Sequence, residues 1–238
     1  MTQFEDIGEV TESRTFHQLG ILVLDGSGSM QATGDGNISL AENVNRAVRE
    51  FLGFFKNSSI ANNFSFAVIT FDNNAKVHTP ITELSKIDDF GDYNPMNGHG
   101  GGTFIGGALA EAEKLASQFL KSPEASSIPH DVRLIVMSDG LCQAPDATKE
   151  ISERLKQCSK IMLCSALVAQ TAKVSESETI EAKTILADMA SASNLYKTLY
   201  TQRAEADLRQ FFISSMSAKK PIESQKLSAP CPICQTLH

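Results

Sequence analysis

The residues best suited to chemistry in this sequence follow its first apolar run, residues 19–24. Asp25, Ser27 and Ser29 alternate with two glycines, so one carboxylate and two hydroxyls stand in a single short loop. Glycines let the backbone turn sharply enough for the three side chains to converge. Grouped oxygen donors suit a hard cation such as Mg²⁺, although the same residue types are also common in ordinary Ser/Gly turns.

Two further loops carry oxygen donors at comparable places. Thr103 follows a glycine-rich connection, residues 98–102, and precedes a helical pattern, while Asp139 comes after the apolar run 132–137. Because the carboxyl ends of parallel strands meet at one edge of a sheet, we expect the three loops to lie together. Jointly they predict one site for Mg²⁺ or Mn²⁺, formed by Asp25, Ser27, Ser29, Thr103 and Asp139.

A second, partial metal motif stands at the end of the chain. Cys231 and Cys234 have the Cys-Pro-x-Cys spacing of a zinc knuckle, and His238 is a candidate third ligand. A structural zinc site needs four ligands, so a fourth would come from elsewhere, or the segment is an unstructured tail with two free thiols. The remaining cysteines are interpreted as reduced packing residues: Cys142, Cys158 and Cys164.

Short apolar runs alternate with helical patterns along most of the chain. This alternation predicts a doubly wound α/β fold with a mostly parallel central sheet and helices on both faces. Ser39 and Glu42 form a capping box at the start of one helix. We expect an N-terminal extension (residues 1–15), one domain (16–217) and a polar tail (218–238).

Length and composition set limits on the function. The 238 residues include 21 Lys and Arg against 28 Asp and Glu, a net charge of −7, which argues against general nucleic-acid binding. The longest apolar runs fall short of the roughly 18–20 residues that a membrane span requires, and the acidic N-terminus is unlike a secretory signal. With an odd number of cysteines, these features predict a cytoplasmic protein.

Enzyme classes that fit parts of the pattern lack a necessary residue. Haloacid-dehalogenase-type phosphatases need a second carboxylate two positions after the nucleophilic aspartate, where this chain has Ser27. The chain has no Gly-x-Ser-x-Gly elbow, and its glycine-rich loop lacks the Gly-Lys-Ser/Thr ending of a P-loop. We therefore expect a binding protein rather than an enzyme, with a Mg²⁺-dependent phosphatase as the less favoured reading.

The three loops together resemble the metal-ion-dependent adhesion site of von Willebrand factor type A (vWA) domains, and the resemblance extends over residues 16–217. It implies that Ser27, Ser29 and Thr103 bind the ion directly in the ligand-engaged state. Asp25 and Asp139 would then hold the ion chiefly through water. An acidic side chain of a protein partner would complete the coordination, so the site would dock a partner rather than catalyse a reaction.

Within that family the chain is most similar to bacterial TerY-like proteins of tellurium-resistance and stress clusters. The similarity rests on residues 68–72, residues 80–84 and the pair Phe211-Phe212 in the last helix. It implies a scaffold in a phosphorylation-linked assembly with a protein kinase and a PP2C-type phosphatase. Two alternatives are a vWA partner of a MoxR-type AAA+ ATPase, and a structural adaptor that makes no use of the metal.

Overall fold

The computed structural model describes residues 14–169, 176–219, 231 and 233–235. Six strands form one sheet in the order β3-β2-β1-β4-β5-β6. The strands are β1 (His17–Asp25), β2 (Phe64–Phe71), β3 (Ala75–Glu83), β4 (His130–Ser138), β5 (Ile161–Ala169) and β6 (Tyr196–Tyr200). Every neighbouring pair is parallel except β2 and β3, which are antiparallel. The doubly wound, mostly parallel sheet expected from the sequence is confirmed.

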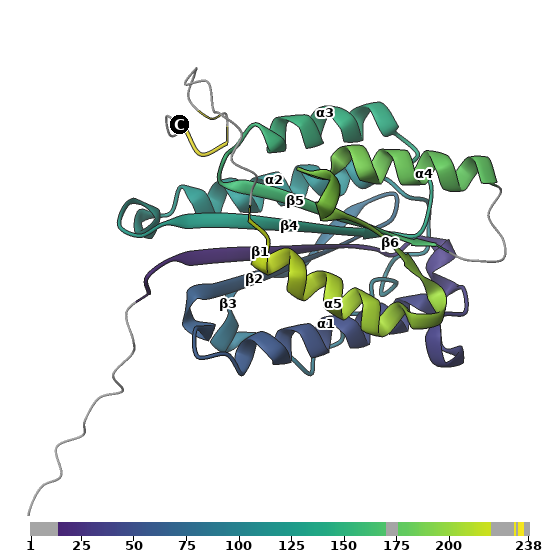
Figure 1. Ribbon diagram of the computed structural model, residues 1–238, viewed down its shortest axis with the longest axis horizontal. Coiled ribbons are helices and arrows are strands. Elements are labelled where there is room, and N and C mark those ends of the chain that lie inside the picture. Colours follow the sequence, from purple (N-terminus) through teal and green to yellow (C-terminus); the bar gives the residue numbers. More distant parts are fainter. Residues whose placement is uncertain (1–13, 170–175, 220–230, 232, 236–238) are drawn as a thin grey trace, which may run out of the picture.

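Helices cover both faces of the sheet (Figure 1). They are α1 (Leu40–Lys56), α2 (Ile105–Leu120), α3 (Pro145–Lys156), α4 (Glu176–Met189) and α5 (Ala204–Ser217). Helices α1 and α5 pack on one face, while α2, α3 and α4 pack on the other. Alternate residues of β1 point to opposite faces, so Leu22 belongs to the first apolar core and Val23 to the second. The sheet is therefore buried on both sides, as its continuous apolar strands require.

Local signals account for where the elements begin. Ser39 is the N-cap of α1, and its Oγ accepts a 3.1 Å hydrogen bond from the backbone N–H of Glu42, as the capping box predicts. Helix α3 begins with Pro145, a residue whose fixed φ suits the first turn. The short strand β6 lies at the edge of the sheet and pairs with β5 alone.

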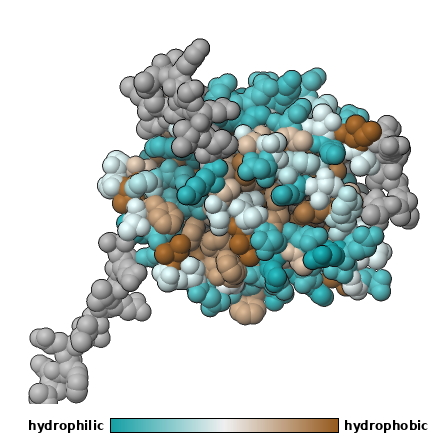
Figure 2. Space-filling view, in the orientation of Figure 1, coloured by the Kyte–Doolittle hydropathy of each residue, from teal (hydrophilic) through white to brown (hydrophobic). Residues whose placement is uncertain are grey.

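The surface mixes hydrophilic residues with separate apolar patches (Figure 2). The large hydrophobic side chains that stand exposed are scattered over different elements: Phe54, Ile60, Phe90, Ile180 and Tyr200. None of the helices in the described ranges combines the length and apolar character that crossing a membrane demands.

Candidate metal centre

The parallel register of β1 and β4 brings two of the three predicted loops together. Leu24 of β1 pairs with Met137 of β4, so the residues that follow them, Asp25 and Ser138, lie side by side. The hydroxyl of Ser138 donates a 2.5 Å hydrogen bond to Oδ2 of Asp25, and both residues are fully buried. Asp139, the next residue, is thereby placed at the same carboxyl edge of the sheet.

Hydrogen bonds link four of the five predicted residues in one network. The backbone N–H of Ser27 donates to Oδ1 of Asp25 at 2.8 Å. The hydroxyl oxygens of Ser27 and Ser29 lie 3.0 Å apart, and the Ser29 hydroxyl donates to Oδ1 of Asp139 at 2.7 Å. Two hydroxyls and two carboxylates from separate loops therefore form one continuous cluster of oxygen atoms.

Thr103, the fifth predicted residue, lies at the edge of this cluster. Together with Ser29 and Asp139 it lines a hollow of about 280 Å³. A Cβ atom placed on Gly140 would stand 3.8 Å from the hydroxyl oxygens of both Ser29 and Thr103. The carbonyl of Thr103 accepts a 2.9 Å hydrogen bond from the backbone N–H of Gln143, which ties the loop before α2 to the loop after β4. All five residues thus gather at one place.

The electrostatics of the cluster favour a bound cation. Burial raises the pKa of Asp25 to about 7, the negative charge of Asp139 adds to the rise, and hydrogen bonds from Ser138 and Ser27 oppose it. A buried carboxylate beside a second acidic group is costly unless a positive charge compensates it. The donors are all hydroxyl or carboxylate oxygens, the type that Mg²⁺ and Mn²⁺ prefer. The residues present therefore fit a hard divalent cation.

A family model of the von Willebrand factor type A domain matches residues 21–141, half of the chain. The chain belongs to the vWA family. The matched range contains all five residues of the cluster. vWA domains bind a divalent metal at the metal-ion-dependent adhesion site and mediate protein interactions. No curated protein matches the sequence.

Solved structures share the vWA fold at low sequence identity. The pilus adhesin SpaC of Lactobacillus rhamnosus GG, in its open conformation, is 14% identical with a TM-score of 0.69, over 86% of this chain and 30% of SpaC. The vWF domain of the type V pili tip protein Mfa5 of Porphyromonas gingivalis is 12% identical with a TM-score of 0.61, over 91% of this chain and 99% of that domain.

A third relative carries a metal at the corresponding motif. Proximal thread matrix protein 1 from the mussel byssus, whose metal-ion-dependent adhesion motif is occupied by zinc, is 16% identical with a TM-score of 0.56. The match covers 84% of this chain and 46% of that protein. At such identities the likeness shows the fold alone. The present chain also spans only about 30% of SpaC, so the adhesin's activity does not transfer with the fold.

Residues that the sequence analysis did not assign to the site hold the loop that carries Thr103. Oδ2 of Asp72, just after β2, accepts a 3.0 Å hydrogen bond from the N–H of Gly101, and the Asn73 side chain accepts one from Gly102. Nδ1 of His99 lies 3.1 Å from Oδ1 of Asp72. Burial raises the pKa of Asp72, but hydrogen bonds outweigh it and lower the pKa to about 2. This side chain is therefore a fixed anchor for the glycine-rich loop.

The segment before that loop packs closely against the loop that follows β1. A Cβ atom on Gly26 would stand 2.1 Å from the carbonyl oxygen of Pro95, so only glycine allows this approach. The segment is itself tied to α1, because the N–H of Tyr93 donates a 2.8 Å hydrogen bond to Oδ1 of Asn45. The stretch 88–97 is thus packed against both the loop after β1 and helix α1.

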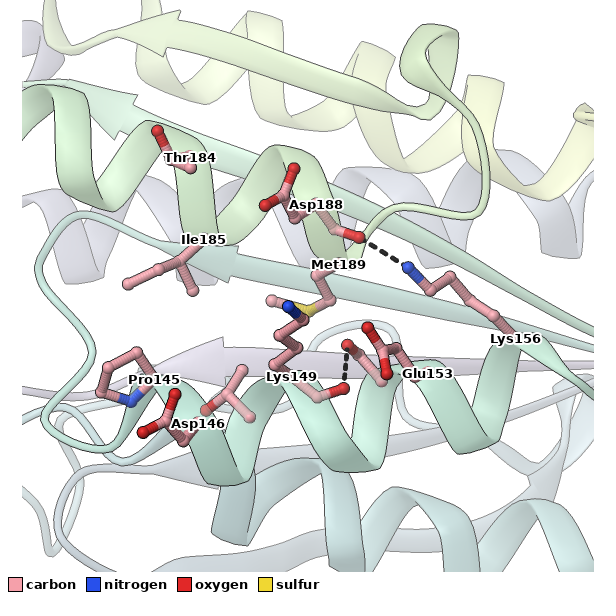
Figure 3. A pocket seen from close by; sticks show the side chains of 11 residues that line it. Pro145, Asp146, Lys149, Glu153, Lys156, Thr184, Ile185, Asp188 and Met189 are labelled. Carbon is pink, nitrogen blue, oxygen red and sulfur yellow. Dashed lines mark hydrogen bonds between the residues drawn. The ribbon is translucent and has the colours of Figure 1, made fainter.

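A separate hollow of about 400 Å³ lies between α3 and α4 (Figure 3). Charged side chains of both signs surround it, and Nζ of Lys156 donates a 2.6 Å hydrogen bond to the carbonyl of Asp188. The hollow lies between two helices rather than at the carboxyl edge of the sheet. None of the five residues of the oxygen cluster lines it.

The predicted zinc residues fall in a different part of the molecule. Cys231 and Cys234 are buried in the apolar core that α2, α3 and α4 share with the sheet, and they meet Cys158, which is interpreted from the sequence as a packing residue. His238 lies outside the described residues. The sequence could not indicate that Cys158 joins this pair, because Cys158 is 76 positions from Cys234 and belongs to no short motif.

Two buried histidines at the opposite edge of the sheet also meet an acidic group. His17 and His130 lie close to Glu124, and Nδ1 of His17 is 3.3 Å from Oε2 of Glu124. The guanidinium of Arg14 contacts the same carboxylate at 3.2 Å. Because an arginine already supplies the positive charge there, the arrangement is that of an ion pair rather than a cation site.

Proposed function

We propose that this vWA domain captures a protein partner through a divalent cation, Mg²⁺ or Mn²⁺, held at its carboxyl edge. The residues that would hold it are Asp25, Ser27, Ser29, Thr103 and Asp139. The observation that supports this proposal is the continuous oxygen network from Asp25 to Asp139, built from loops that are far apart in sequence.

The mixture of donors suits docking. Hydroxyl oxygens carry no net charge, so a cation held mainly by them keeps most of its attraction for a further carboxylate. The two aspartates are engaged by hydroxyls of Ser138 and Ser29, which orients them beside the cation position. An acidic side chain of the partner would supply the remaining ligand. The Ser29 side chain is exposed, so such a group can approach it from solvent.

The hollow beside the cluster gives the partner a second point of contact. Its walls combine the polar edge with apolar side chains from β5, α4 and the loop after β4: Leu141, Leu167, Ala169 and Ala182. A partner that places a carboxylate at the metal can therefore place a small apolar side chain in this hollow. Specificity for the partner would come from the carboxylate and the apolar side chain together, rather than from the carboxylate alone.

For the biological setting we propose a cytoplasmic, TerY-like assembly in which the domain is a scaffold between a protein kinase and a PP2C-type phosphatase. The cytoplasmic location is in keeping with five cysteines of which none forms a disulfide. The alternative is docking on a MoxR-type AAA+ ATPase. The two settings use the same surface and differ in the partner.

We propose further that the site does not catalyse a reaction. Ser27 stands where a metal-dependent phosphatase of the dehalogenase type needs an acid–base carboxylate, and its hydroxyl is engaged with Ser29. Metal-dependent hydrolysis of an aryl phosphate that exceeds the rate of an Asp25→Asn variant would contradict this part of the proposal.

The test is a pull-down of the tagged chain from its native cells, in Mg²⁺ and again in EDTA, with bound proteins identified by mass spectrometry. Wild type is compared with Ser29→Ala, and with Glu150→Gln as a matched surface change on α3 away from the cluster. We expect partners that require Mg²⁺, are lost with Ser29→Ala and are kept with Glu150→Gln.

The identity of these partners separates the two settings. A kinase and a phosphatase would support the TerY-like assembly, and an AAA+ ATPase the alternative. A list of partners that is the same in EDTA and in Mg²⁺ would contradict capture through a metal.

A further inference from the structure

Three cysteine thiols meet at the edge of the sheet opposite the oxygen cluster. Cys158, Cys231 and Cys234 are all buried, and their sulfur atoms lie within 4.8 Å of one another. The Sγ atoms of Cys158 and Cys234 are 3.7 Å apart. Cys158 precedes β5, whereas the oxygen cluster follows β1 and β4, so the two groups stand at opposite ends of the parallel strands.

Specific contacts hold the two cysteines of the tail against the domain. The Ser117 hydroxyl of α2 donates a 3.3 Å hydrogen bond to the carbonyl of Ile233, whose side chain is buried in the same apolar core as Cys158. The backbone N–H of Gln235 donates to the carbonyl of Cys231 at 2.9 Å, which closes a tight turn around the pair. Residues 231 and 233–235 are therefore packed against the domain.

The spacing of the sulfur atoms excludes a disulfide and fits zinc ligation. In a disulfide they would be about 2.05 Å apart, well below the distance seen. In a tetrahedral zinc site with Zn–S bonds of about 2.3 Å, the sulfur atoms stand roughly 3.8 Å apart. The 3.7 Å between Cys158 and Cys234 is the length of a thiol-to-thiol hydrogen bond, and it already places the two sulfur atoms at the separation that zinc ligation requires.

One backbone contact of Cys158 favours a metal thiolate. The backbone N–H of Lys160 donates a hydrogen bond to its sulfur. Burial raises the pKa of the Cys158 thiol, and this hydrogen bond acts in the opposite direction, toward the deprotonated form that binds metal. The Cys-Pro-x-Cys turn supplies two more sulfur atoms, those of Cys231 and Cys234.

We propose that Cys158, Cys231 and Cys234 bind a zinc ion that fastens the C-terminal segment to the domain between α2 and the start of β5. Sulfur ligands favour zinc over Mg²⁺, so this site and the oxygen cluster select different metals. Three thiolates leave one position of the tetrahedron for a further ligand. The site fixes the tail whether or not the oxygen cluster binds a partner.

The test uses the full chain in an Asp25→Ala/Ser29→Ala background, which removes the oxygen cluster as a competing zinc site. Zinc per chain is measured by elemental analysis after purification without chelators, and the metal is then exchanged for Co²⁺. We expect one zinc per chain and, with cobalt, the thiolate-to-metal charge-transfer band and the visible bands of a tetrahedral site. These spectra report thiolate ligation without any change to the cysteines.

Cys158→Ser is then compared with Cys164→Ser, a matched buried cysteine on β5 that packs in the other core. We expect Cys158→Ser to lose most of its zinc and to weaken the charge-transfer band, while Cys164→Ser keeps both. Absence of a cobalt–thiolate band, bound iron in place of zinc, a disulfide among the three cysteines in freshly isolated protein, or an unchanged cobalt spectrum in Cys158→Ser would each overturn the proposal.

Discussion

The hydroxyl of Ser29 donates a 2.7 Å hydrogen bond to Oδ1 of Asp139, across 110 positions of sequence. The bond joins the loop after β1 directly to the loop after β4. It uses the hydroxyl proton of Ser29, so in the 3.0 Å contact with the Ser27 hydroxyl the Ser29 oxygen is the acceptor. The hydrogen bond to Asp139 thus fixes the position of the Ser29 side chain. The hydroxyl is therefore oriented before a cation binds.

A variant without the Ser29 hydroxyl distinguishes the contribution of this group to metal binding from its contribution to the stability of the fold. In Ser29→Ala we expect the rise in melting temperature caused by Mg²⁺ to be lost, while the metal-free protein loses only about 1 kcal/mol, as for one hydrogen bond at a partly exposed site. Thermal unfolding with Mg²⁺ and with EDTA measures both quantities. The control is Ser126→Ala, which removes an exposed turn hydroxyl bonded to the Pro123 carbonyl. An equal Mg²⁺ effect in both variants would contradict a role for Ser29 in metal binding.

Gly26 tests whether the close approach of the two rim segments matters. A methyl group there would stand 2.1 Å from the Pro95 carbonyl oxygen, so Gly26→Ala must push the backbone apart. We expect it to cost about 2 kcal/mol or more and to weaken the Mg²⁺ effect, because the loop that carries Ser27 would shift.

The matched substitution is Gly53→Ala in α1. Its new Cβ would meet Oδ2 of Asp89 at 3.6 Å, an ordinary contact, and alanine favours a helix by about 0.5–1 kcal/mol over glycine. We expect a higher melting temperature and an unchanged Mg²⁺ effect. Denaturant unfolding of both variants, with and without Mg²⁺, checks the pair. If Gly26→Ala is no less stable than wild type, the close approach of Pro95 does not require glycine at position 26.

The sequence was enough to predict the sheet, the capping of α1 by Ser39 and the grouping of the five oxygen donors. These depend on local signals and on one rule, that the ends of parallel strands share an edge. The supports of the site were harder to predict. The bond of Asp72 to Gly101 joins a strand end to a loop 29 positions away, and Cys158 meets Cys234 through the path of the tail. No periodicity encodes such contacts, because they depend on how loops cross in space.

The hollow beside the cluster supports a prediction about partner binding. Leu141 lines its wall next to Asp139 but offers no oxygen to a metal from its side chain. In Leu141→Ser we expect Mg²⁺ to raise the melting temperature as in wild type, while Mg²⁺-dependent capture of the partner weakens. Loss of an apolar contact worth about 1–2 kcal/mol corresponds to roughly 5–30-fold in affinity. Quantitative pull-down and thermal unfolding check the two effects, and capture equal to wild type would show that the partner leaves the hollow empty.

The raised pKa of Asp25 makes the metal-free domain sensitive to pH. Its carboxyl group titrates near 3.8 when unfolded and about 7 when folded. Below pH 4 it is protonated in both states, so its contribution to stability is complete. As pH rises toward 7 the unfolded state releases the proton while the folded state keeps it, and stability is lost, by at most about 4 kcal/mol, until the folded group also ionises.

The comparison of wild type with Asp25→Asn isolates this effect from other carboxyl groups such as Asp72, whose lowered pKa acts in the opposite direction below pH 4. In EDTA we expect wild type to become progressively less stable relative to Asp25→Asn between about pH 4 and pH 7, and the difference to level off above that. Saturating Mg²⁺ should remove most of the loss in wild type and have no effect on the variant, because the cation compensates the carboxylate charge that asparagine lacks. Unfolding free energies from denaturant titrations across this pH range provide the measurement. A difference between the two proteins that does not change with pH would mean that Asp25 is ionised in the folded domain at every pH tested, and that it needs no cation to be so.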